Sequence, residues 1–136
     1  VRELEKVNSD FPEYAEAQEM LLRSEYVLLH RRYQRSSGKE RMETLGKLVE
    51  RSVKLADSEL LISSVNDIGE ELDASRDPEQ TKVLLGMMEQ TLASKDPVLM
   101  DRALKHLLMR FDRLNNQAAV RPQMFQMIGS IKLAMM

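Results

Sequence analysis

The 136-residue sequence contains no cysteine, few aromatic residues and no long apolar run. Without cysteine, disulfides, thiolate metal sites and cysteine nucleophiles are all excluded. The longest uncharged stretch, residues 122–131, is too short to span a bilayer, which needs about 20 apolar residues. The missing thiols fit a reducing compartment, so we expect a cytoplasmic protein without a membrane segment.

Signals for β-strands are equally scarce. Aromatic residues make up 4% of the chain, and apolar and polar residues alternate over only a few positions at a time. Leu, Glu, Lys, Arg, Met, Gln and Ala, which favour helices, dominate instead. Because 43% of the residues are hydrophobic, the chain can bury a core. We therefore expect residues 1–136 to form a single all-α domain, an antiparallel helical bundle of about five or six helices.

The first predicted helix covers residues 11–35. Asp10 has the position of an N-cap, with Pro12 in the first turn and Glu13 completing a capping box. The apolar residues of this helix cover a wide face, which predicts contact with two neighbours. They are Tyr14, Ala17, Leu21, Leu22, Tyr26, Leu28, Leu29 and Tyr33.

The next segment, residues 39–74, is compatible with one helix or with two. Ser37 and Glu40 form a second capping box, which predicts a helix start. Asp57 and Ser58 then interrupt the helical pattern. We favour two helices, because a continuous helix over this range would be long for a globular protein.

A short repeat marks the following two helix starts. Residues 75–78, Ser-Arg-Asp-Pro, recur as Ser-Lys-Asp-Pro at 94–97. In each copy the aspartate, Asp77 or Asp96, has the position of an N-cap and the proline that of the first helical residue. The repeat predicts two consecutive helices running in opposite directions. The second carries the clearest apolar stripe: Met100, Ala103, Leu104, Leu107, Leu108, Phe111 and Leu114. We expect Leu104, Leu107, Leu108 and Phe111 to be buried together on one face of this helix.

No motif for catalysis, metal binding or cofactor binding is present. The two histidines, His30 and His106, lie 76 residues apart and belong to no Glu-x-x-His motif. The glycines are isolated, so no loop can hold a phosphate, and no Gly-x-Ser-x-Gly nucleophile motif occurs. We expect no enzymatic activity, no metal and no cofactor.

Charge is distributed in two opposite blocks. Residues 31–55 carry eight basic and three acidic side chains, a net charge of +5. Residues 56–79 carry eight acidic side chains and one basic one, a net charge of −7. The basic block is compatible with a nucleic-acid surface or with ordinary solvated and paired helix faces. Because the whole chain has a net charge of −2, we favour the second interpretation and expect no nucleic-acid partner.

The last predicted helix opens at Pro122 and has Lys132 as its only charged residue. Methionine-rich apolar faces adapt to peptides and partner helices, but they also serve as core. We take this face as the candidate surface for a protein or peptide partner, with a second copy of the chain as one possibility. Its residues are Met124, Phe125, Met127, Ile128, Ile131 and Met135.

Three stretches resemble the C-terminal helical region of bacterial DnaK-type chaperones. They are residues 2–33 (RELEKVNSDFPEYAEAQEMLLRSEYVLLHRRY), 94–114 (SKDPVLMDRALKHLLMRFDRL) and 121–125 (RPQMF). The resemblance implies a lid beside a peptide-holding β-sandwich, with ATP hydrolysis in a separate N-terminal domain. It implies no catalytic residue within this chain.

The leading hypothesis is therefore a non-catalytic protein-binding helical module excised from a longer chain, with such a lid as its narrower form. The alternative is a stand-alone helical adaptor or regulator whose basic segment, residues 31–41, contacts nucleic acid. The two hypotheses differ in what the gene encodes upstream of Val1.

Overall fold

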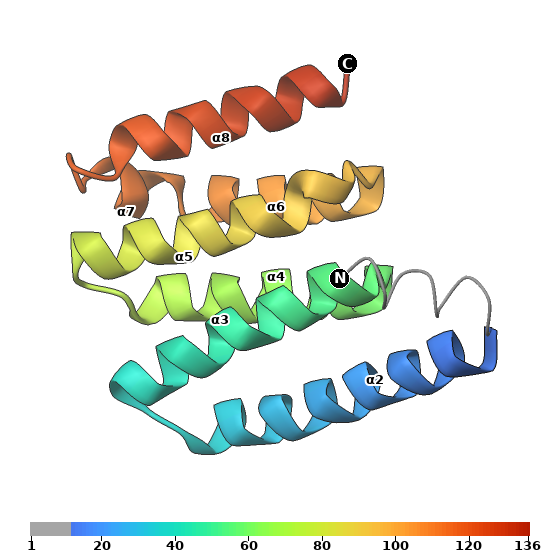
Figure 1. The fold of residues 1–136 in the computed structure, drawn as a ribbon. Helices are drawn as coiled ribbons and strands as arrows, with labels where there is room; N and C mark the ends of the chain where they lie inside the picture. The colour runs from blue at the N-terminus through green and yellow to red at the C-terminus, as the bar shows by residue number, and fades with distance from the viewer. Residues whose placement is uncertain (1–11) are drawn as a thin grey trace. The chain divides into compact units, whose positions relative to one another are not determined.

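A computed structural model describes residues 12–136, so the predicted cap at Asp10 lies outside the described part of the chain. This part contains seven α-helices, labelled α2 to α8 in Figure 1, one short 3₁₀ helix and no strand. The prediction of an all-α helical bundle is confirmed. The number of helices exceeds the predicted five or six, because the helix that starts at Pro97 is interrupted at Arg110.

The chain divides into two compact units, Val1–Leu55 and Ala56–Met136. The boundary lies where residues 39–74 break into two helices, the alternative favoured from the sequence. Ala56 adopts a left-handed backbone (φ 51°), which ends the preceding helix. The Asp57 carboxylate then accepts hydrogen bonds from the amides of Glu59 (2.9 Å) and Leu60 (3.2 Å), which starts the next helix.

The first unit is a hairpin of α2 (Pro12–Arg35) and α3 (Gly38–Leu55), which pack along each other (Figure 1). Arg41 fastens the turn, because its guanidinium lies 4.2 Å from the ring centre of Tyr33 and donates to the Tyr33 and Ser36 carbonyls. The buried apolar residues of this unit follow helical spacing on both helices: Tyr26, Tyr33, Leu45, Leu48 and Val49.

The second unit contains α4 (Ser58–Ala74), α5 (Pro78–Thr91), α6 (Pro97–Met109), α7 (Phe111–Asn115) and α8 (Arg121–Ala134). A 3₁₀ helix, Leu92–Ser94, connects α5 to α6. Helix α4 packs against both α5 and α6, and α8 does the same on the opposite side (Figure 1). Helices α5 and α6 run in opposite directions, as the repeat predicted, and both lie between α4 and α8.

Both caps predicted from the repeat are confirmed. The Asp77 side chain accepts from the amide of Glu79 at 3.0 Å, and the Asp96 side chain accepts from the amide of Val98 at 2.9 Å. Asp96 has a second role, because its other carboxylate oxygen accepts a hydrogen bond from the Ser58 hydroxyl at 2.9 Å. That bond places the start of α4 beside the start of α6.

The predicted stripe on the helix from Pro97 is only partly buried. Leu107 is fully buried, Leu104 and Phe111 are half-buried, and Leu108 is 47% exposed, contrary to the prediction for this residue. Leu108 directly follows the buried Leu107, so it lies at the margin of the buried side of α6. The helix ends two residues later, at its C-cap Arg110. The buried residues of α6 are Leu99, Met100, Ala103 and Leu107.

Replacing Leu107 by Ala should lower the free energy of unfolding by about 2–5 kcal/mol, since it removes a fully buried side chain. Leu108→Ala is the matched control and should cost less than about 0.5 kcal/mol, as at most surface positions. Urea denaturation of both variants measures the difference. Equal losses for the two variants would contradict the assignment of the buried side of α6.

Candidate functional site

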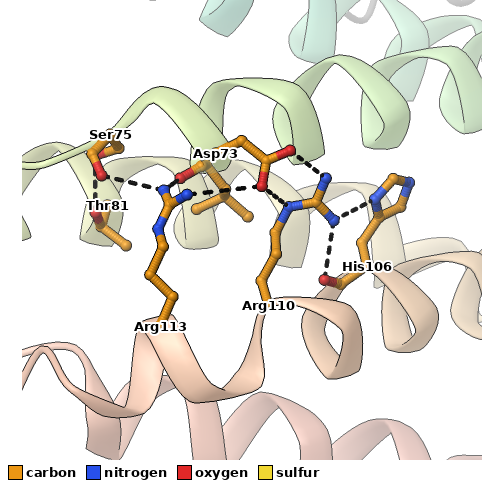
Figure 2. A network of polar contacts seen from close by, with 7 residues as sticks. Asp73, Ser75, Thr81, His106, Arg110 and Arg113 are labelled. Atoms are coloured by element: carbon orange, nitrogen blue, oxygen red, sulfur yellow. Dashed lines mark hydrogen bonds and ion pairs between the residues drawn. The ribbon is translucent and has the colours of Figure 1, made fainter.

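A polar network joins α4 to the segment that contains α6 and α7 (Figure 2). At its centre, Arg110 donates two hydrogen bonds to the carboxylate of Asp73, each 2.8 Å long. The Arg110 side chain is only 10% exposed, whereas the Asp73 side chain is 55% exposed. The hydrogen bonds and charge of Arg110, with the nearby Arg113, hold the pKa of Asp73 below its usual value.

His106 belongs to the same network and has both ring nitrogens occupied. Its Nε2 lies 2.9 Å from the side-chain oxygen of Asn66, and its Nδ1 lies 2.9 Å from a guanidinium nitrogen of Arg110. Arginine can only donate, so Nδ1 accepts and the proton of the neutral ring lies on Nε2, which donates to Asn66. Burial lowers the pKa of His106, and the charges of Arg110 and Arg102 lower it further.

Gly69 makes the position of this ring possible. A Cβ atom at residue 69 would lie 2.4 Å from Nδ1 of His106 and 2.7 Å from its Cε1. Only a glycine on α4 therefore allows the imidazole to reach Asn66 from α6.

Arg113 completes the network at the C-terminal end of α4. It donates to the carbonyls of Leu72 and Ser75, which lie in the last turn of the helix and at its C-cap (Figure 2). A cation at this end also interacts favourably with the helix dipole. Ser75 in turn shares a 2.8 Å hydrogen bond with Thr81 on α5, so the network reaches the four helices α4, α5, α6 and α7.

The network is suited to positioning helices rather than to catalysis. A general base needs a free nitrogen within reach of a substrate proton, and both nitrogens of His106 are engaged. Within residues 12–136, no three His, Asp or Glu side chains come together as metal ligands. No helix in this range has both the length and the hydropathy that a membrane span requires.

The candidate surface on the last helix divides into core and exterior. Met124, Met127, Ile128 and Ile131 are buried, so these four are not available to a partner in this structure. Phe125 and Met135 are 48% and 43% exposed. The Phe125 ring packs edge-on against Phe111 at 5.8 Å between ring centres, which draws it towards α7. Leu133 is 72% exposed as well, so α8 keeps apolar residues at the surface in addition to its buried side.

Another exposed apolar face lies on α2. Successive steps of three and four residues place six residues on the side opposite the buried Tyr26 and Tyr33. All six are exposed, with exposures of 65% for Met20, 59% for Leu21 and 63% for Leu28. We call this face the outer stripe: Ala17, Met20, Leu21, Ser24, Val27 and Leu28.

Two hollows border the outer stripe at its C-terminal end. One, of about 430 Å³, is lined by Leu28, Arg31, Arg32, Arg35, Ser36 and Glu40. The other, of about 440 Å³, lies between α2 and α3 and shares Leu28 and Arg32. Arginine beside exposed leucine suits an acidic, partly apolar protein surface.

The sequence pointed to two neighbours for α2 but not to this face as a binding surface. The sequence predicted a binding surface on the methionine-rich last helix instead, because that helix has almost no charge. The His106 network was missed altogether, since Asn66 and His106 are 40 residues apart and no local motif connects them.

Comparisons with protein-family models, with curated proteins and with solved structures find no match for this chain.

Gly69→Ala should destabilise the protein by about 1 kcal/mol, although alanine normally favours a helix interior, because the added methyl displaces the His106 ring. Gly86→Ala, inside α5 with open space around it, is the matched control and should stabilise by about 0.5–1 kcal/mol. Thermal or urea unfolding measures both effects. In a His106→Ala background the penalty at residue 69 should disappear; a penalty that persists there would contradict the proposed clash.

Stability should fall as the pH drops below about 6.5, because the unfolded chain protonates His106 more readily than the folded chain does. The contribution of this neutral ring is complete above pH 6.5 and is lost as the pH falls through its lowered pKa. His106→Gln should reduce the dependence of the unfolding free energy on pH between about 7.5 and 5. In the control variant His30→Gln, the pH dependence that His106 contributes should remain. An unchanged pH profile in His106→Gln would reject this role.

Proposed function

We propose that this chain is a non-catalytic protein-binding helical module whose binding surface is the outer stripe of α2. The observation that carries the proposal is a run of exposed apolar and small residues without any charge from Ala17 to Leu28 on one side of a helix. Monomeric proteins rarely expose a continuous apolar face of this kind, which usually marks an interaction site.

The helical spacing of the stripe also fits a familiar mode of recognition. Anchors at steps of three and four residues are how amphipathic helices bind grooves and other helices. Met20 contributes a flexible side chain that adapts to a partner, and Leu21 and Leu28 contribute branched ones. The arginines that follow Leu28 supply a charged rim at one end.

A narrower form of the proposal is the lid or C-terminal region of a DnaK-type chaperone in the cytoplasm. Its support is the resemblance of residues 2–33, 94–114 and 121–125. It requires that the full-length gene encode an ATPase domain and a β-sandwich domain upstream of Val1. A start codon directly before Val1 would reject it.

The alternative, nucleic-acid contact through residues 31–41, has weaker support. Arg32 forms an ion pair with Glu40 at 3.2 Å, and Arg41 is engaged at the hairpin turn. Glu40 lies in the same hollow as the three arginines, so a phosphate there would meet a carboxylate. Phosphate contacts also weaken steeply with salt. We expect no binding to DNA or RNA tighter than micromolar at physiological salt.

The proposal is tested by site-specific photocrosslinking in cells that express the full-length protein. A photoreactive amino acid at Leu21 should give light-dependent protein adducts that mass spectrometry assigns to a defined peptide. The same residue at Val98 is the matched control, because Val98 is 60% exposed on α6 but lies outside the outer stripe. Adducts at Leu21 that do not exceed those at Val98 would contradict the proposal.

A further inference from the structure

Charges of opposite sign flank the outer stripe at its two ends. Glu13 precedes the stripe, and Arg31 and Arg35 follow it, on the same side of α2 at the same three- and four-residue steps. All three residues are exposed. The acidic end and the basic end are thus separated by an uncharged middle.

The stripe is also nearly symmetric about Ser24. Met20 and Leu28 lie four residues on either side of it, and Leu21 and Val27 lie three residues on either side. Glu13 and Arg35 are each 11 residues from it. A two-fold axis brings the same surface of both copies together. A stripe that is symmetric about its centre and has opposite charges at its two ends meets this requirement.

We propose that the partner of the outer stripe is a second copy of the same chain, with the two α2 helices packed antiparallel about a two-fold axis at Ser24. This inference rests on the proposed function of the stripe. Met20 of each copy then packs against Leu28 of the other, and Leu21 packs against Val27. The small Ser24 side chain lets the helices approach closely at the crossing.

Electrostatics favour the antiparallel dimer over a parallel dimer and over binding to an anionic membrane. In the antiparallel dimer, Glu13 of each copy faces Arg35 of the other, and this pair occurs twice. Parallel packing would instead bring Glu13 against Glu13 and Arg35 against Arg35, and like charges oppose association. An anionic membrane would attract the basic end but repel the N-terminal half of α2, which carries Glu13, Glu16 and Glu19.

The hollow beside Leu28 gives the second copy a place to bind. It is about 430 Å³ in volume and contains Arg31, Arg32 and Arg35. In the antiparallel register, Ala17 of the second copy lies opposite Arg31, and Glu13 lies opposite Arg35. The incoming carboxylate therefore lies opposite the guanidinium of Arg35, while Arg32 in the same hollow is already paired with Glu40.

Disulfide trapping tests the register directly, because residues 1–136 contain no cysteine of their own. Under mild oxidation, full-length Ser24→Cys should form a covalent dimer, since the two thiols meet at the axis. Arg31→Cys is the control, because residue 31 of one copy would lie about 21 Å from residue 31 of the other, at 1.5 Å per helical residue. A disulfide needs Cα atoms within about 7 Å.

Charge exchange and native mass give a second, independent measurement. Sedimentation of the wild-type protein should show a dimer. Glu13→Arg alone and Arg35→Glu alone should each raise the dissociation constant of the dimer about tenfold. The double variant should restore it, and circular dichroism should show that all variants are folded.

Several results would overturn the proposal. These are a monomeric wild-type protein, equal trapping of Ser24→Cys and Arg31→Cys, or no rescue in the double variant. If photoadducts at Leu21 map to a different protein while the chain is monomeric, the second copy is rejected and the binding function stands. If the chain is monomeric and Leu21 gives no adducts, both are rejected.

Discussion

A side of a helix can be buried only by a neighbour that reaches it, and within Val1–Leu55 the neighbour of α2 is α3. Tyr26 and Tyr33 are buried on one side of α2, while the opposite side carries the outer stripe. Because α3 does not reach that opposite side, the apolar side chains of the outer stripe face water within this unit. The proposed function and the proposed partner both follow from this one imbalance.

In Ala56–Met136 the corresponding constraint is the close approach of α6 to α4 at Gly69. The imidazole of His106 occupies the space that a side chain would fill, and Asn66 and Arg110 satisfy its nitrogens. Arg110, the C-cap residue of α6, then pairs with Asp73 on α4. Because the His106 ring at its centre has no free nitrogen, we assign the network to the fold. The proposed binding function lies on the surface of α2.

The features that the sequence revealed were those with local causes. Asp77 and Asp96 each cap a helix within three residues of their own position, so composition and spacing were sufficient to find them. The break of residues 39–74 into two helices follows from the same chemistry.

Features that depend on distant residues could not be read from the sequence. A helix with as little charge as α8 is equally compatible with core and with a surface, and only its packing against α5 and α6 shows that Met124 is core. Leu108 belongs to the periodic stripe of its helix, but Arg110 ends that helix before a fourth turn. The Asn66–His106 pair needs a register between α4 and α6 that no local pattern specifies.

The central claim is that the outer stripe of α2 is a surface for a second copy and not part of the folding core. It is tested most directly by the midpoint of thermal unfolding as a function of protein concentration, for the wild type and for Leu21→Glu. Since association stabilises the folded state by mass action, the wild-type midpoint should rise with concentration. The Leu21→Glu midpoint should stay constant and equal that of the wild type at high dilution. A variant destabilised at every concentration, or a wild-type midpoint independent of concentration, would contradict the account.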